Sequence, residues 1–167
     1  MNIQTKIDER SREEAHSSDF ALWAIAQGRL LREGRFDELD IENLFDEVDD
    51  LGQARRSELR SRLETLIEHM LKLNYGTHPY PRSGWRKTML NARHEIDHLL
   101  DESPSLHRYL PDFYEQAWHV GQTRAVLSFW DHEPDLYEKY EKEIPETPIY
   151  SLDQVLAHDF FPQRDDT

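Results

Sequence analysis

Apolar side chains recur at helical spacing through most of the chain, and no stretch alternates between apolar and polar residues as a β-strand would. The first such segment begins after Ser17 or Ser18, either of which we expect to cap a helix. Gly34 predicts the end of that helix. Its inner face is expected to comprise Phe20, Trp23, Ala24, Gln27, Leu30 and Leu31.

Two further apolar stripes follow without a long polar break. Asp40 is expected to cap a second helix, and Gly52 is expected to end it as a hinge or cap. The inner stripe of this second helix is Ile41, Leu44, Phe45, Val48 and Leu51. A third helix, to about Tyr75, has the most regular stripe in the chain: Leu59, Leu63, Leu66, Ile67, Met70 and Leu71.

The second half of the chain predicts three more helices and a short helical turn. The loop GTHPYPRSG precedes a fourth helix, which begins near Ser83 and runs through the HEIDH segment. The pair Ser103 and Pro104 predicts a short helical turn, and aromatic residues cover more than one face of residues 112–129, which predicts a helix buried on two sides. Ser151 with Gln154 matches a capping box for a last short helix.

These segments predict an all-α fold of about six helices. We expect the first four to form an antiparallel, bundle-like core, with the aromatic helix packed across it. Residues 1–16 are expected to be a mobile arm, 17–162 a single helical domain and 163–167 a C-terminal tail.

Several segments together resemble a known protein family. They are DFALW, LLREGRFDELDIENLFDEVDDLG, RSELRSRLETLIEHMLK, SGW after the proline loop, ESPSLHRYL and SLDQVLAHDFFP. Between about Asp19 and Pro162 the chain resembles the bacterial, cyanobacteria-rich domain-of-unknown-function family DUF29. The resemblance implies a compact all-helical domain and supplies no reaction, ligand or catalytic residue.

Charge and composition narrow the classes of partner. The net charge is −14, and the half of the chain after residue 90 is the more acidic. Such a field repels nucleic acid and anionic membranes, and it favours solubility or a basic protein partner. The chain has no cysteine, no signal peptide and no long apolar run, so a cytoplasmic location is expected.

Four polar residues are candidates for a cluster in the core: Glu42, Glu47, His69 and Arg86. Glu47 and His69 would make a carboxylate–imidazole pair, able to serve as metal ligands, as acid and base, or as a buried hydrogen bond. The hydrogen bond is favoured, because buried polar groups normally find partners.

The segment HEIDH, from His94 to His98, matches the HExxH pattern of zinc peptidases. Its surroundings do not fit, because Asp97 stands inside the pattern and the glycine and third histidine of the extended form are absent. A second metal hypothesis combines His69 with either of these histidines across two helices. We expect no metal or other cofactor.

Two basic groups could bind a partner. Arg55, Arg56, Arg60 and Arg62 could contact phosphate, but pairing with Asp97, Asp101 and Glu102 on the fourth helix explains them better. Tyr80, Arg82 and Trp85 form an aromatic and basic loop suited to gripping a protein, although Trp85 is favoured as a core residue.

The favoured hypothesis is a protein-interaction or regulatory module, with nucleic-acid binding disfavoured. The alternative is a metal-dependent hydrolase or metal-binding protein that uses the histidines and glutamates named above. No phosphate-binding glycine loop or serine nucleophile motif is present, so an enzyme is the less favoured class. The sequence leaves the partner, the substrate, the presence of a ligand pocket and the oligomeric state open.

Overall fold

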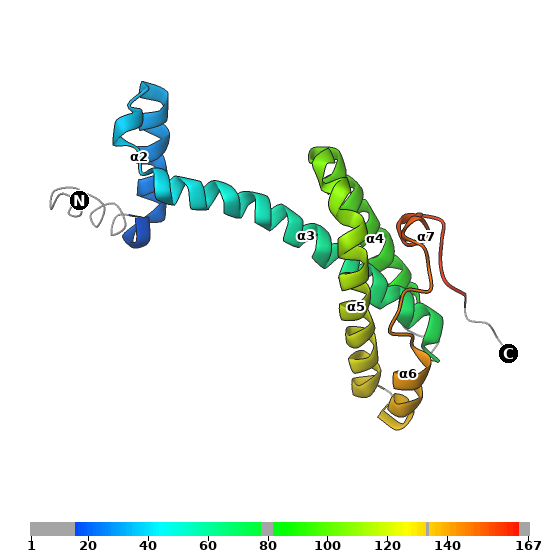
Figure 1. Ribbon diagram of the computed structural model, residues 1–167. Helices are drawn as coiled ribbons and strands as arrows, with labels where there is room; N and C mark the ends of the chain where they lie inside the picture. Colours follow the sequence, from blue (N-terminus) through cyan, green and yellow to red (C-terminus); the bar gives the residue numbers. More distant parts are fainter. Residues whose placement is uncertain (1–15, 78–81, 133, 164–167) are drawn as a thin grey trace. The chain divides into compact units, whose positions relative to one another are not determined.

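A computed structural model describes residues 16–77, 82–132 and 134–163 of the chain. Every regular element in these ranges is helical, and they contain no strand, so the all-α prediction is confirmed (Figure 1). The chain divides into two compact units, Met1–Gln53 and Ala54–Thr167. The boundaries predicted for a single domain at 17–162 and for its arm and tail stay predictions.

The first unit contains helix α2, Phe20–Glu33. Its N-cap is Asp19, whose carboxylate accepts the backbone N–H of Leu22 at 3.1 Å. The prediction of Ser17 or Ser18 as the cap was wrong, because both serines are themselves helical. Gly34 ends α2 in the left-handed region, with φ of 70°, as predicted.

After a single 3₁₀ turn at Phe36–Glu38, helix α3 runs from Ile41 to Tyr75 without a break. The helix end or cap predicted at Gly52 was wrong, because this glycine lies inside a helix of 35 residues, and the hinge considered there stays a prediction. Its neighbours Leu51, Gln53 and Ala54 are compatible with a helix, and Gln53 donates to the Asp49 carboxylate at 2.7 Å. The two compact units meet at Gln53 and Ala54, directly after this glycine.

The second unit contains the rest of α3 and all later elements. These are α4 (Arg82–Glu102), a 3₁₀ helix (Pro104–Tyr109), α5 (Leu110–His132), a 3₁₀ turn (Pro134–Leu136), α6 (Tyr137–Glu143) and α7 (Leu152–Leu156). The helix predicted near Ser83 and the short turn after Ser103 are both present.

Ion pairs fix the direction of α4 against the second half of α3. Arg55 lies 3.4 Å from Glu102, and Arg62 lies 3.2 Å from Glu95. Residue numbers rise on one helix as they fall on the other, so the two helices are antiparallel, as predicted.

Helix α5 runs in the same direction as α3. The Arg56 guanidinium lies over the Tyr109 ring at the start of this pairing. Further along both helices, Gly121 lies against Ile67, where a Cβ on the glycine would be only 2.9 Å from a methyl carbon of the isoleucine. The two helix backbones therefore come close at Gly121.

These three helices enclose the hydrophobic core of the second unit. The aromatic helix packs against two neighbours, as predicted: Gly121 lies against Ile67 of α3, and the Phe129 ring stacks on the Tyr140 ring of α6 with centroids 4.0 Å apart. The buried cluster of this unit begins at Leu59. Its members from α3 and α4 are Leu59, Leu63, Leu66, Ile67, Met70, Leu71, Leu73, Met89, Ala92, Ile96, Leu99 and Leu100.

The C-terminal segment lies along α4, as the ribbon beside α7 shows (Figure 1). The predicted capping box of Ser151 and Gln154 is confirmed at the start of α7. The side chain of Arg93 donates to the backbone oxygens of Val155, within α7, and of Phe160, after it, at 2.8 Å each. Arg93 is 1% exposed, so a buried arginine fastens this segment to α4.

Candidate functional site

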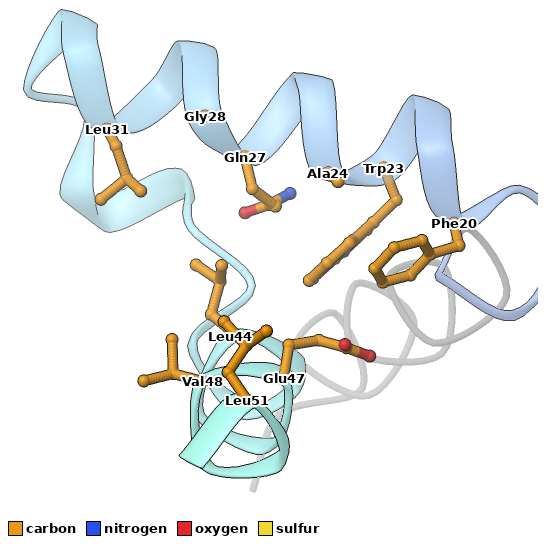
Figure 2. Close-up of a pocket in the computed structure, with 10 residues that line it drawn as sticks. All are labelled: Phe20, Trp23, Ala24, Gln27, Gly28, Leu31, Leu44, Glu47, Val48 and Leu51. Carbon is orange, nitrogen blue, oxygen red and sulfur yellow. The ribbon is translucent and has the colours of Figure 1, made fainter. Parts of the chain in front are cut away.

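An apolar groove lies inside the first unit, between α2 and the beginning of α3. It has a volume of about 290 Å³. Figure 2 shows Trp23 and Leu31 on α2 and Leu44, Val48 and Leu51 on α3 facing this space. Phe20, Ala24, Gln27, Gly28 and Glu47 complete its lining.

A hydrogen-bond network centred on Asp40 holds the two walls of the groove together. The Asp40 carboxylate accepts the indole N–H of Trp23 at 3.0 Å and the side-chain amide of Asn43 at 2.8 Å. The backbone N–H of Asp40 donates to the Gln27 side chain at 2.9 Å. Trp23, Gln27 and Asp40 are buried, so these hydrogen bonds are shielded from water and hold α2 against the start of α3 beside the apolar groove.

Glu47 supplies the carboxylate of the groove lining, and this carboxylate contacts an imidazole. Its Oε1 lies 2.8 Å from Nε2 of His16, whose ring meets Trp23 edge-on at 4.5 Å between centroids. The carboxylate–imidazole pair considered for Glu47 therefore exists, but with His16 as the partner. It orients Glu47 at the edge of the groove.

The predicted inner stripe of the first α3 turns is largely exposed. Phe45 and Leu51 are each 70% exposed, Val48 is 66% exposed and Ile41 is 60% exposed. The expectation that these residues face a core was therefore wrong. On α2, the predicted inner residue Trp23 is buried, whereas Phe20 and Leu31 remain about half exposed.

Acidic side chains surround this apolar surface. Residues 41–53 of α3 contain five carboxylates (Glu42, Asp46, Glu47, Asp49 and Asp50) and no lysine or arginine. Residues 16–53 together carry ten acids and three arginines, a net charge of −7. Two of those arginines, Arg29 and Arg35, already pair with Glu33 at 2.6 and 2.9 Å. The groove therefore lies in a negative field.

The four residues of the predicted polar cluster have different surroundings. Glu42 is exposed, and Glu47 pairs with His16 in the first unit. His69 belongs to the second unit, where its Nδ1 lies 2.9 Å from the backbone oxygen of Thr65, and burial lowers the pKa of its imidazole below the ordinary 6.5. Arg86 lies over the ring of Phe161, with 5.5 Å to the ring centroid.

The predicted interaction loop is described only in part. Tyr80 lies outside the described residues. Arg82 is the first residue of α4 and donates to the backbone oxygen of Gly76 at 3.4 Å. Trp85 is half-buried against the core, and its ring covers Gly76 so closely that a Cβ there would be 2.8 Å away.

The arginine cluster on α3 is largely engaged within the second unit. Arg55 and Arg62 pair with α4 carboxylates, as stated above, although these are Glu102 and Glu95. Arg56 lies over the Tyr109 ring, and Arg60 lies over the Phe113 ring. Of the acids predicted as partners, Glu102 is confirmed.

The charged residues and histidines of the HEIDH segment are exposed on α4, whereas Ile96 is buried, and His98 Nδ1 is 3.6 Å from Glu102. His94 and Asp97 instead face His158 from the segment after α7. The ligand atoms of His94, Asp97 and His158 all lie within 4.8 Å of one another. This is the group in the described part of the chain that could hold a metal ion.

Two residues of these arrangements were missed from the sequence. The sequence predicts Asp40 only as a helix cap, whereas its hydrogen bond to Trp23 spans 17 residues, and no local spacing predicts it. His158 is not a candidate from the sequence, because its contact with Asp97 spans 61 residues. The only signal was its place in the family-like segment SLDQVLAHDFFP.

Comparisons with known proteins give a family and no function. Neither the curated proteins nor the solved structures contain a match to this chain. Within the described residues, no helix has both the length and the apolar character needed to cross a membrane. The family described as "Domain of unknown function DUF29" matches residues 15–161, and the chain therefore belongs to that family.

Proposed function

We propose that this chain is a protein-interaction module whose α2–α3 groove binds an amphipathic helix of a partner protein, with lysine or arginine beside the apolar stripe of that helix. The observation that carries the proposal is the exposed stripe of Ile41, Phe45, Val48 and Leu51 next to an apolar groove. Exposed apolar surface of this kind marks binding sites in soluble proteins. An apolar helix face laid into a groove is a recurrent mode of peptide recognition.

The negative charge beside the groove indicates which kind of partner helix would bind there. The five carboxylates on residues 41–53 have no neighbouring base in that stretch, so a basic partner would gain charge complementarity and a faster encounter. A second copy of this chain would bring another set of residues 16–53 with a net charge of −7, and like charges would oppose that pairing. A basic amphipathic helix is therefore favoured over self-association.

The test uses a fluorescent synthetic Leu/Lys amphipathic helix as the probe, with a Leu/Glu helix of the same pattern as its control. Val48→Glu places a charge in the groove, and we expect at least about a tenfold loss of affinity for the Leu/Lys helix, or roughly 1.4 kcal/mol. The added charge is negative, so purely electrostatic binding would instead be strengthened. Fluorescence anisotropy at physiological salt measures the affinity.

Leu127→Glu is the matched control, because Leu127 is 54% exposed on α5 in the other unit. It should leave the affinity unchanged. Equal binding of the Leu/Glu helix, or equal losses in both variants, would contradict the proposal. A wild-type dimer in light scattering that Val48→Glu makes monomeric would assign the groove to a second copy instead.

A further inference from the structure

Three side chains from distant parts of the sequence meet on the surface of the second unit. His94 and Asp97 are one turn apart on α4, and His158 follows α7. Nε2 of His158 lies 2.7 Å from Oδ2 of Asp97, and the rings of His158 and His94 have centroids 4.8 Å apart. The Asp97 and His158 side chains are 55% and 40% exposed, so an ion could reach them from solvent.

The backbone that carries His158 is held in place independently of this cluster. Arg93, the neighbour of His94, donates to the backbone oxygens of Val155 and Phe160 on either side of His158. The Phe161 ring covers the same guanidinium at 5.4 Å. The buried arginine therefore holds the C-terminal part of the cluster against α4, which reduces the ordering cost of binding an ion.

We propose that His94, Asp97 and His158 bind a first-row transition-metal ion, with Zn²⁺ as the expected ion. Two imidazoles and one carboxylate make a donor set that suits Zn²⁺ better than Mg²⁺ or Ca²⁺, which prefer oxygen ligands. Ligand atoms about 2.1 Å from a tetrahedral ion lie about 3.4 Å from each other. The observed separations, from 2.7 Å up to 4.8 Å, bracket that value, and small rotations of exposed side chains would reach it.

This site differs from the HExxH pattern, in which the two histidines of one helix share the ion. Here His98 points to Glu102, at 3.6 Å, and the second histidine comes from the C-terminal segment. Bound metal would thus cross-link the segment after α7 to α4. Three protein ligands would leave a fourth position for water or for an acidic group of a partner.

The test uses the full-length chain without a histidine tag, freed of metal by a chelator. Zn²⁺ is titrated by calorimetry, and Co²⁺ is titrated by its visible absorption, which reports tetrahedral coordination. We expect one ion per chain. His94→Ala and His158→Ala should each weaken binding by at least about tenfold, a loss that even residues supporting a metal ligand produce.

His98→Ala is the matched control, because this histidine lies on the same exposed face of α4 and outside the cluster. The chain has nine histidines, so the control separates this site from general surface binding. Asp97→Asn keeps a hydrogen-bonding side chain next to His158 and should also weaken binding, and circular dichroism confirms that each variant is folded. Failure to bind one ion, or losses with His98→Ala and none with His158→Ala, would overturn the proposal.

Discussion

At the scale of single residues, Gly121 shows how one missing side chain determines helix packing. A Cβ at this position would lie 2.9 Å from the Ile67 side chain and 3.0 Å from backbone atoms of Glu64 and Glu68. Backbone atoms of a neighbouring helix cannot move aside as a flexible side chain can, so an added methyl group must push α5 away from α3.

Gly121→Ala is therefore expected to lower the free energy of unfolding by about 1–3 kcal/mol, although alanine is the better helix former. Gly84→Ala is the control, because a Cβ there would meet nothing within 4 Å. The control should be neutral or stabilising by up to about 1 kcal/mol. Urea denaturation of both variants measures the difference, and equal effects would argue against a close crossing at Gly121.

At the scale of elements, helix α3 shows which parts of the fold could be read from sequence. Its stripe from Leu59 to Leu71 repeats at helical spacing and is buried, as predicted. The earlier stripe, including Phe45 and Val48, has the same spacing and is exposed. The periodicity of apolar residues therefore predicts the helix correctly. It does not predict which of the two stripes is buried by other parts of this chain.

The uninterrupted course of α3 through Gly52 leads to a prediction about this glycine. Inside a helix, glycine costs about 0.5–1 kcal/mol relative to alanine, because it has more backbone freedom to lose. Gly52→Ala should raise the free energy of unfolding of α3 by about that amount, and Gly52→Pro should lower it by about 3 kcal/mol or more. Denaturation followed by the helical circular dichroism signal measures both changes, and a loss of stability in the alanine variant would contradict a regular, uncrowded helix at Gly52.

At the scale of the whole molecule, the two units differ in how much they bury. The buried side chains within residues 16–53 are Trp23, Gln27, Leu39 and Asp40, of which two are polar. The second unit contains the whole hydrophobic cluster from Leu59 onward. Regions with few buried apolar contacts open at low free energy, so stability should be concentrated in the second unit.

This difference predicts the pattern of amide hydrogen exchange. In the free chain, amides of α2 should exchange much faster than those of Leu63–Leu73, because opening the first unit disrupts little apolar packing. Adding the Leu/Lys helix at about ten times its dissociation constant should slow exchange in α2 by about tenfold, because binding stabilises the closed form it contacts. Exchange in α5 should not change, since that helix belongs to the other unit. Mass spectrometry of peptide fragments measures both regions, and equal protection of α2 and the α3 core without the probe would contradict this distribution of stability.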